Sequence, residues 1–225
     1  VILLLGLKPV VVDIDPKTFN INPSLIKDKI SDKTKAIIPV HLFGQTCNME
    51  EILKIANKHN LFVIEDNAQA LGSMYKFSSS EKQMAGTIGD ISTTSFFPSK
   101  NLGCYGDGGA IMTNSDNLAY KIRGLVNHGM YERYYHDEIG VNSRLDSIQA
   151  AILNVKLKYL NKYNNSRQES AKLYNEKFDN MELLETPFVE SDFDTHVYHQ
   201  YTLKVKDGMR DKLAEHLSKN NIPFG

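Results

Sequence analysis

Short apolar runs alternate with amphipathic segments of about a dozen residues over the first two thirds of the chain. We expect strands at 10–12, 36–40 and 61–64, because each is a run of mainly apolar residues rich in valine and isoleucine. Helices are expected from Ser24 and after Asn48, since both residue types are common helix N-caps. This alternation predicts βαβ units and an α/β fold with a mainly parallel sheet covered on both faces.

The elements that follow depart from strict alternation. Strand candidates at 91–97 and 109–113 are separated by only eleven residues, three of them glycine, so a full crossover helix is not expected between them. Ser115 is expected to cap the next helix. From Leu145 onward, apolar residues recur every three or four positions, which predicts one long helix that bends or breaks near residues 164–165.

Two domains are expected, with the boundary inside this long helix. Residues 1–162 are predicted to form the large α/β domain, and residues 163–225 a smaller α+β domain with a strand at 199–205 and a helix starting near Gly208. The sequence begins without methionine and stops just after a proline. We therefore expect both domains to be incomplete parts of a longer protein.

Charge and cysteine content exclude several classes of protein. Lysine and arginine number 26 against 27 acidic residues, so no net field attracts the chain to nucleic acid or an anionic membrane. The longest apolar run, residues 1–5, is too short to span a bilayer. Cys47 and Cys104 lack CxxC spacing, so no metal site is expected, and so few cysteines suggest a reducing, cytoplasmic location.

Lys100 lies where a predicted strand ends at Pro98 and a glycine-rich loop begins. Its neighbours are aromatic, small or turn-forming, unlike those of an ordinary solvated lysine, although a plain surface lysine is the alternative interpretation. Ligand sites in α/β proteins gather at the carboxyl ends of strands. An amine that is neutral there can form a Schiff base with a carbonyl compound.

Asp66 follows the predicted strand at 61–64 and so lies at another strand's carboxyl end. An acid there could pair with a metal, a ribose hydroxyl or a protonated ring nitrogen, and it could equally be a helix N-cap. Taken with Lys100, 34 residues later, it matches the needs of pyridoxal phosphate. A carboxylate stabilises the pyridinium ring, and a lysine holds the aldehyde.

Four motifs carry a family resemblance. They are Val40-His41-Leu42-Phe43-Gly44-Gln45; Glu65-Asp66-Asn67-Ala68-Gln69-Ala70; Ser95-Phe96-Phe97-Pro98-Ser99-Lys100 with Gly106-Asp107-Gly108-Gly109-Ala110; and Gly140-Val141-Asn142-Ser143-Arg144 before Gln149-Ala150-Ala151. In this order, over essentially the whole chain, they resemble the DegT/DnrJ/StrS family of pyridoxal-phosphate sugar aminotransferases. The resemblance implies the fold-type I, aspartate aminotransferase-like fold.

The resemblance also implies roles for individual residues. Lys100 is similar to the lysine that holds the cofactor and moves protons, and Asp66 to the partner of the pyridine nitrogen. Gln69 is similar to a glutamine near the ring hydroxyl, and Ser95 to a ligand of the cofactor phosphate. Asn142 resembles an asparagine that reaches the phosphate in the neighbouring subunit, which implies a homodimer with shared active sites.

Two further residues are weaker candidates. Arg144 shares the Asn142 loop and could meet an anionic group of the substrate. His41 is either a substrate contact or a structural hydrogen bond at a strand end. His196 and His199, which flank Tyr198 in the predicted small domain, are expected to serve packing or the surface.

The resemblance implies transamination. L-Glutamate is the expected amino donor and a nucleotide-linked ketosugar the acceptor, giving an amino sugar nucleotide for surface polysaccharide or secondary-metabolite glycosylation. Residues 196–201 most resemble members that aminate carbon 3 of nucleotide-linked hexoses, including acetamido-uronate types, rather than carbon 4.

Three alternatives stay open. A branch of the same fold dehydrates or deoxygenates sugars, but its members resemble one another in having a histidine at the position of Lys100. The lysine in this chain therefore favours transamination. A non-catalytic sensor or regulatory member of the family has no need of that lysine. The third alternative is a plain α/β binding domain without a cofactor.

Members of this family carry an upstream phosphate loop and an aromatic residue stacked on the cofactor, and we find neither in this sequence. We therefore predict that the 225-residue chain made alone binds pyridoxal phosphate poorly or misfolds. Absorbance titration of the purified chain with the cofactor measures this, and tight binding would refute it.

Overall fold

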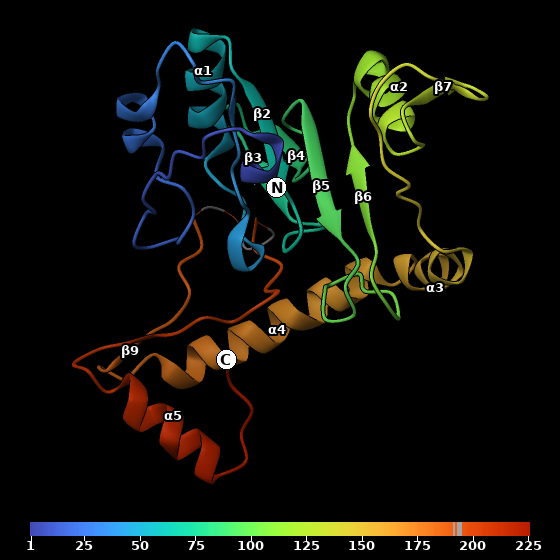
Figure 1. The fold of residues 1–225 in the computed structure, drawn as a ribbon. Coiled ribbons are helices and arrows are strands. Elements are labelled where there is room, and N and C mark those ends of the chain that lie inside the picture. The colour runs from blue at the N-terminus through green and yellow to red at the C-terminus, as the bar shows by residue number, and fades with distance from the viewer. Residues whose placement is uncertain (191, 193–194) are drawn as a thin grey trace.

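The computed structural model describes residues 1–190, 192 and 195–225 (Figure 1). Its centre is a four-stranded sheet in the order β1-β2-β5-β6. The strands are β1 (Ala36–Ile37), β2 (Phe62–Asp66), β5 (Ile91–Ser95) and β6 (Gly109–Met112). The first three are parallel, while β6 runs antiparallel to β5. The predictions of a mainly parallel sheet, and of a β5–β6 connection without a crossover helix, are confirmed.

One face of the sheet is covered by helix α1 (Met49–His59). Ile52 and Ile55 of the helix are buried in one cluster with Ile37 and Val63 of the sheet. Burial of apolar surface of this kind is the main favourable contribution to folding. This cluster is the core of the α/β part of the chain.

The opposite face of the same sheet is open to solvent in the part of the chain described. Phe62 is 59% exposed and Ile111 47% exposed. Ile38, two residues after Ala36 and thus on the Phe62 side, is 39% exposed. The prediction that both faces are covered is therefore wrong for these residues, since no described helix packs on this side.

Two of the three predicted helix N-caps, Asn48 and Ser115, are confirmed. The side chain of Asn48 accepts a hydrogen bond from the N–H of Glu51 at 3.3 Å. Helix α2 (Asp116–Leu125) begins after Ser115, whose hydroxyl accepts from the N–H of Leu118 at 3.4 Å. Each cap satisfies an N–H group that has no partner within its helix.

The first thirty residues differ from prediction. Residues 10–12 form no strand, because a strand needs a hydrogen-bonded neighbour and the only ladder contact nearby is the isolated bridge Ile14–Ile21. In place of a helix from Ser24 there are short 3₁₀ turns, with another near the start of the chain. They are η1 (Leu3–Leu5), η2 (Pro23–Leu25) and η3 (Lys27–Lys29). Asn22 caps η2 by accepting from the N–H of Ser24.

Smaller hairpins and turns complete the α/β part. A serine-rich loop joins an antiparallel pair of strands, and a second pair follows α2. These elements are η4 (Leu42–Gly44), β3 (Met74–Lys76), β4 (Lys82–Met84), β7 (Met130–Glu132) and β8 (Tyr135–His136).

The long helix breaks earlier than predicted. It forms α3 (Ser147–Leu157) and α4 (Leu160–Phe178), separated at Tyr159, where φ is −109° and ψ is 1°. Asn164 and Asn165 lie inside α4. The side chain of Asn164 has partners outside the helix and so does not compete for its backbone groups, which explains why no break occurs there.

The residues after α4, from 179 to 225, are called the tail. The tail contains β9 (Leu184–Glu185), β10 (Lys204–Val205) and α5 (Arg210–Lys219). The helix expected near Gly208 is confirmed, but the strand expected at 199–205 shortens to β10, which pairs with β9. Among the residues described, none of the helices combines the length and apolar character needed to cross a membrane.

The tail returns to the sheet through backbone contacts. The N–H of Val197 donates to the carbonyl of Gly44 at 2.9 Å, and that of Thr46 donates to the carbonyl of Thr195 at 3.2 Å. In Figure 1, α4 passes below the end of the sheet toward which the β5 arrow points. Both features gather the tail at the carboxyl ends of the strands.

We predict that Asn164→Ala destabilises the protein by about 1–3 kcal/mol, because it leaves buried polar partners without hydrogen bonds. Asn101 Nδ2 would lose an acceptor at 2.8 Å, and the Leu71 carbonyl a donor at 3.1 Å. Urea unfolding measures the change. Asn165→Ala is the control: this side chain is exposed on the same helix, so its effect should stay within about 0.5 kcal/mol. Equal effects of the two substitutions would contradict the assignment.

Candidate active site

Asp66 is the last residue of β2, at the carboxyl end of the central sheet. Its Oδ1 accepts a hydrogen bond from the N–H of Ala68 at 3.0 Å, within a turn. No described helix starts here, so Asp66 is not the helix N-cap that its spacing allowed. The second oxygen, Oδ2, has no hydrogen-bond partner among the described residues. The side chain is half-buried, which leaves that oxygen available to a ligand.

Gln69 holds the turn after β1 in place. Its Oε1 accepts from the N–H of Phe43 at 2.6 Å. Phe43 has φ of +58°, in the left-handed region that non-glycine residues seldom adopt. At Gly44, a Cβ atom would lie 2.8 Å from the N atom of His199, so only glycine fits. The amide nitrogen of Gln69 is therefore the end of this side chain left for a ligand.

His41 is fully buried and hydrogen-bonded at both ring nitrogens. Its Nδ1 accepts from the N–H of Cys47 at 3.1 Å, which places the proton on Nε2, 2.8 Å from Oε2 of Glu65. Because neither nitrogen is free and the side chain has no exposed surface, the structure favours a structural role over contact with a substrate.

Glu65 is a buried acid to which the sequence analysis assigned no role of its own. Besides His41, it accepts hydrogen bonds at 2.6–2.8 Å from the N–H groups of Gly86, Ile88 and Gly89. Burial alone would raise the pKa of Glu65, but the hydrogen bond from His41 and those from these N–H groups lower it below its usual value. The residue is therefore an ionised anchor for the end of β2.

Lys100 follows β5 in a tight loop. Its N–H donates to the carbonyl of Phe97 at 2.9 Å, and at Gly103 a Cβ atom would clash with the carbonyl of Pro98. The side chain is half-buried, and its amino group has no hydrogen-bond or ion-pair partner in the part of the chain that the structure describes. A loop this compact can hold one lysine in place beside the sheet.

Ser95 ends β5 on the strand next to Asp66. Its hydroxyl accepts from the N–H of Phe97 at 3.2 Å, so its own proton remains free for an acceptor such as a phosphate oxygen. β2 and β5 are neighbours, with Asp66 opposite Thr93. The parallel strands thus bring Asp66, Ser95 and the Lys100 loop to one edge of the sheet.

Asn142 and Arg144 are exposed and lie between β8 and α3. Asn142 forms a bridge with Asn127, after α2. In Figure 1 this segment lies beyond β6, on the side of the sheet away from β1 and β2. The structure does not bring either residue to Asp66 and Lys100 within one chain, which leaves a contribution to a neighbouring subunit as the prediction for Asn142.

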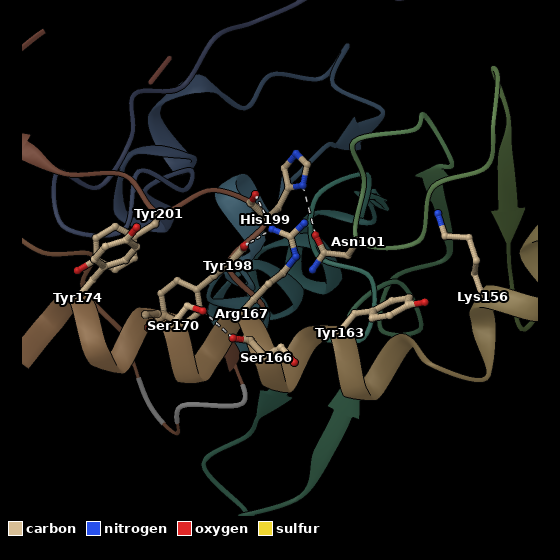
Figure 2. A pocket seen from close by; sticks show the side chains of 11 residues that line it. Asn101, Lys156, Tyr163, Ser166, Arg167, Ser170, Tyr174, Tyr198, His199 and Tyr201 are labelled. Carbon is tan, nitrogen blue, oxygen red and sulfur yellow. Dashed lines mark hydrogen bonds between the residues drawn. The ribbon is translucent and has the colours of Figure 1, made fainter. Parts of the chain in front are cut away.

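A cavity of about 600 Å³ lies between α4 and residues 198–201 (Figure 2). Sequence reasoning did not find it, because its walls come from segments far apart in the chain. Arg167 projects from α4 and donates to the carbonyls of Tyr198 and His199 at 3.0 and 3.3 Å. The lining residues include Lys156 and Arg167 and no acidic side chain, so the cavity is positively charged.

Two histidines of the tail, His196 and His199, have pKa values well below the usual range. Burial lowers the pKa of His196 to about 3. Burial, followed by the positive charges of Lys100 and Arg167, lowers the pKa of His199 to about 4. Asn101 Oδ1 lies 3.3 Å from Nδ1 of His199, so this histidine lies beside the loop that contains Lys100. For His196 the expected packing role agrees with its burial, while His199 lines the cavity.

The available groups fit the expected cofactor. A carboxylate with one free oxygen, a half-buried amine without a partner and a serine hydroxyl with a free proton occupy one edge of the sheet. Pyridoxal phosphate carries the three complementary groups. Its pyridine nitrogen matches the carboxylate, its aldehyde matches the amine and its phosphate matches the serine hydroxyl.

Comparison with known proteins gives a family and a set of relatives. The profile of the DegT/DnrJ/EryC1/StrS aminotransferase family matches residues 1–225. The chain is 48% identical over 219 residues to the "Pleiotropic regulatory protein" of Geobacillus stearothermophilus, covering 96% of this chain and 57% of that protein. It is 45% identical over 220 residues to the "UDP-2-acetamido-2-deoxy-3-oxo-D-glucuronate aminotransferase" of Pseudomonas aeruginosa, covering 98% and 59%. The chain thus spans somewhat more than half the length of these relatives.

Solved structures with the same fold include two with a named ligand. DesV of S. venezuelae, in complex with a ketimine intermediate, matches with a TM-score of 0.90 and 33% identity over 99% of this chain and 58% of that one. Ntda of Bacillus subtilis, with bound cofactor PMP, matches with a TM-score of 0.86 and 34% identity over 98% and 49%. The fold is therefore the fold-type I α/β fold of pyridoxal-phosphate aminotransferases.

We predict that Glu65→Gln destabilises the protein at pH 7 by about 1.5–3 kcal/mol, the usual range for hydrogen bonds to a charged group. Because the folded-state pKa of Glu65 lies below its usual value of 4.5, its contribution is fully present above pH 4.5 and is lost as the pH falls through the folded pKa. The difference between wild type and variant should narrow accordingly, as measured by urea unfolding at pH 7 and at lower pH.

Glu51→Gln is the control for this prediction, because the Glu51 side chain is 51% exposed and should contribute little at either pH. A Glu65→Gln effect that is equally large at all pH values would show that the charge of Glu65 is not the cause.

Proposed function

The chain belongs to the DegT/DnrJ/EryC1/StrS aminotransferase family, and from this we propose that the protein is a pyridoxal-phosphate-dependent aminotransferase. The proposed acceptor is a nucleotide-linked ketosugar and the proposed donor is L-glutamate. One observation carries the proposal: Lys100 presents an amino group without a partner, among the described residues, beside the strand ends that hold Asp66 and Ser95.

Each residue has a task in this reaction. Bound pyridoxal phosphate supplies an aldehyde that condenses with amines and a ring that stabilises negative charge at the substrate's α-carbon. Lys100 Nζ holds that aldehyde between turnovers and, once free, takes a proton from the donor's α-carbon as general base. The free Oδ2 of Asp66 keeps the ring nitrogen protonated. Ser95 donates its hydroxyl proton to the phosphate, and Gln69 offers its amide nitrogen to the ring hydroxyl.

We propose carbon 3 of the sugar as the site of amination. The name of the Pseudomonas aeruginosa relative specifies a 3-oxo sugar linked to UDP, and the identity of 45% supports a related acceptor here. Arg144 remains the proposed contact for an anionic group of the substrate. An amino sugar nucleotide of this kind would serve the glycosylation of a surface polysaccharide or a secondary metabolite.

A regulatory function is the second candidate, because the Geobacillus stearothermophilus relative carries a regulatory name. A sensor could bind the cofactor and the sugar nucleotide at the same candidate site without catalysing a reaction. A glutamate-dependent change of the bound cofactor to its amine form separates the two candidates. A sugar dehydratase is less supported, since members of that branch are expected to have a histidine where this chain has Lys100.

We further propose a homodimer formed through α3. Ile148 is 73% and Val155 61% exposed, and with the half-buried Ile152 between them they recur every three or four residues along one side of the helix. Large exposed apolar stripes mark interaction sites. Asn142 lies a few residues before this helix. When a second copy docks on α3, Asn142 of one copy would therefore lie near the phosphate site of the other copy.

A cytoplasmic location is proposed alongside this function. Cys47 and Cys104 are both buried and free thiols, which suits a reducing compartment.

Lys100→Ala should lower transamination by at least about 10³-fold, because it removes both the cofactor anchor and the general base. Purified full-length protein is assayed with glutamate and a panel of UDP- and dTDP-ketohexoses, and cofactor attachment is read by borohydride reduction. Lys58→Ala, at an exposed position on α1, should leave the rate unchanged. A Lys100→Ala variant with normal turnover would remove the basis of the proposal.

Ile148→Asp combined with Val155→Asp should convert the dimer to a monomer, because it places charges within the apolar stripe. Light scattering coupled to size-exclusion chromatography measures the mass. Asn154→Asp adds a charge on the same helix but outside the stripe, and should leave the dimer intact. A wild-type protein that is monomeric, or a double variant that stays dimeric, would exclude this interface.

A further inference from the structure

The Lys100 loop comprises residues 96–108, between β5 and β6. The N–H of Phe96 donates to the carbonyl of Gly108 at 2.8 Å, and the carbonyl of Phe96 accepts from the N–H of Cys104 at 2.8 Å. The fully buried thiol of Cys104 donates to the same carbonyl at 3.0 Å. These bonds close the backbone on both sides of Lys100.

Helix α3 supports this loop from outside. Oε1 of Gln149 accepts a hydrogen bond from the N–H of Tyr105 at 2.8 Å. The amino group of Lys156 donates to the carbonyl of Gly103 and lies 5.8 Å from the centre of the Tyr105 ring, within the range of a cation–π contact. Figure 2 shows the Lys156 side chain extending from its helix toward the loop. One helix thus binds the loop backbone at two points.

An apolar contact accompanies the two polar ones. Leu153 of α3 is buried in one cluster with Leu102 and Cys104 of the loop. Gln149, Leu153 and Lys156 follow one another at intervals of four and three residues, so they lie on one face of α3. The loop therefore rests on this face of the helix.

The composition of the loop explains why such support is needed. Three of its residues are glycine, and glycine loses more conformational freedom on folding than any other residue. Contacts from outside the loop must offset this loss if the loop is to keep one conformation. At Gly106 a Cβ atom would lie 3.0 Å from Nε2 of Gln149, so the helix and the loop backbone are in close contact.

We propose that Gln149 and Lys156 are positioning residues for Lys100. From one face of α3 they hold the backbone of the Lys100 loop, and so keep the Lys100 side chain at the strand ends that carry Asp66. This inference rests on the role of Lys100 in the proposed function. Both side chains act through main-chain groups of the loop, at the N–H of Tyr105 and the carbonyl of residue 103.

Amide hydrogen exchange tests the contact made by Gln149. In the full-length protein, the Tyr105 N–H should exchange at least about tenfold faster in Gln149→Ala, because it loses its acceptor, as measured by NMR. Gln149→Glu keeps an oxygen acceptor and should stay within about threefold of wild type. Asn154→Ala, at an exposed position of the same helix, is the control and should leave the rate unchanged. Equal rates in wild type and Gln149→Ala would overturn the proposal.

Trace acetylation with acetic anhydride tests the effect on Lys100. Because Lys100 is half-buried, loosening the loop should raise its labelling at least about threefold in Lys156→Met, read by peptide mass spectrometry against exposed Lys58. Lys156→Arg keeps a cationic donor and should stay within about 1.5-fold of wild type. Lys158→Met, an exposed lysine at the end of α3, is the matched control.

Three labelling results would overturn the proposal. They are an unchanged Lys100 in Lys156→Met, an equal rise in Lys156→Met and Lys156→Arg, and a rise at every lysine alike, which would indicate general unfolding. Gln149→Ala should raise the labelling of Lys100 in the same direction as Lys156→Met, since both substitutions release the same loop.

The exchange and labelling measurements need neither cofactor nor substrate, so they separate this inference from the proposed function. In the cofactor-loaded enzyme, Lys156→Met should lower kcat at least about tenfold and leave KM for glutamate within about twofold, because the displaced lysine acts in the chemical step. Failure of transamination with the expected exchange and labelling would reject the activity alone. A normal kcat in Lys156→Met would reject the positioning role alone.

Discussion

The buried pair of His41 and Glu65 is the interaction on which the carboxyl end of the sheet depends. Glu65 receives four hydrogen bonds, one from His41 and three from backbone N–H groups in residues 86–89. These bonds join the end of β1, the end of β2 and the loop before β5. Because side chains alternate along a strand, anchoring Glu65 on the inner face turns its neighbour Asp66 to the other face. Two adjacent acids thus take different roles, one in the fold and one in the site.

Local chemistry was predictable where it is decided by neighbours in the chain. The caps at Asn48 and Ser115 need only the next three residues, and both are confirmed. The prediction of a helix break near Asn164 was wrong, because the hydrogen-bond partners of the Asn164 side chain, Asn101 and Leu71, are 63 and 93 residues away in the sequence. The strand at 10–12 was wrong for a similar reason, since the β-branched run has no strand beside it.

The residues of the candidate site also differ in whether nearby sequence or long-range contacts decide their position. Asp66 and Lys100 could be predicted because both follow strands, and parallel neighbours place their carboxyl ends at one edge. His199 could not, since its hydrogen bond to Asn101 spans 98 positions. Glu65 was also hidden, because nothing in its own neighbourhood distinguishes an acid that will be buried from one that will be exposed. Pairing across long separations in the chain is a property of the fold, and only the fold reports it.

Part of the join between the tail and the sheet is made by backbone alone. Gly44 lies against the backbone N atoms of Tyr198 and His199, and hydrogen bonds between the main chains of 44–46 and 195–197 hold the segments together. Main-chain contacts do not depend on side-chain identity. These main-chain bonds therefore tolerate changes of side chain at the positions that make them, whereas position 44 needs a glycine to let the two backbones meet.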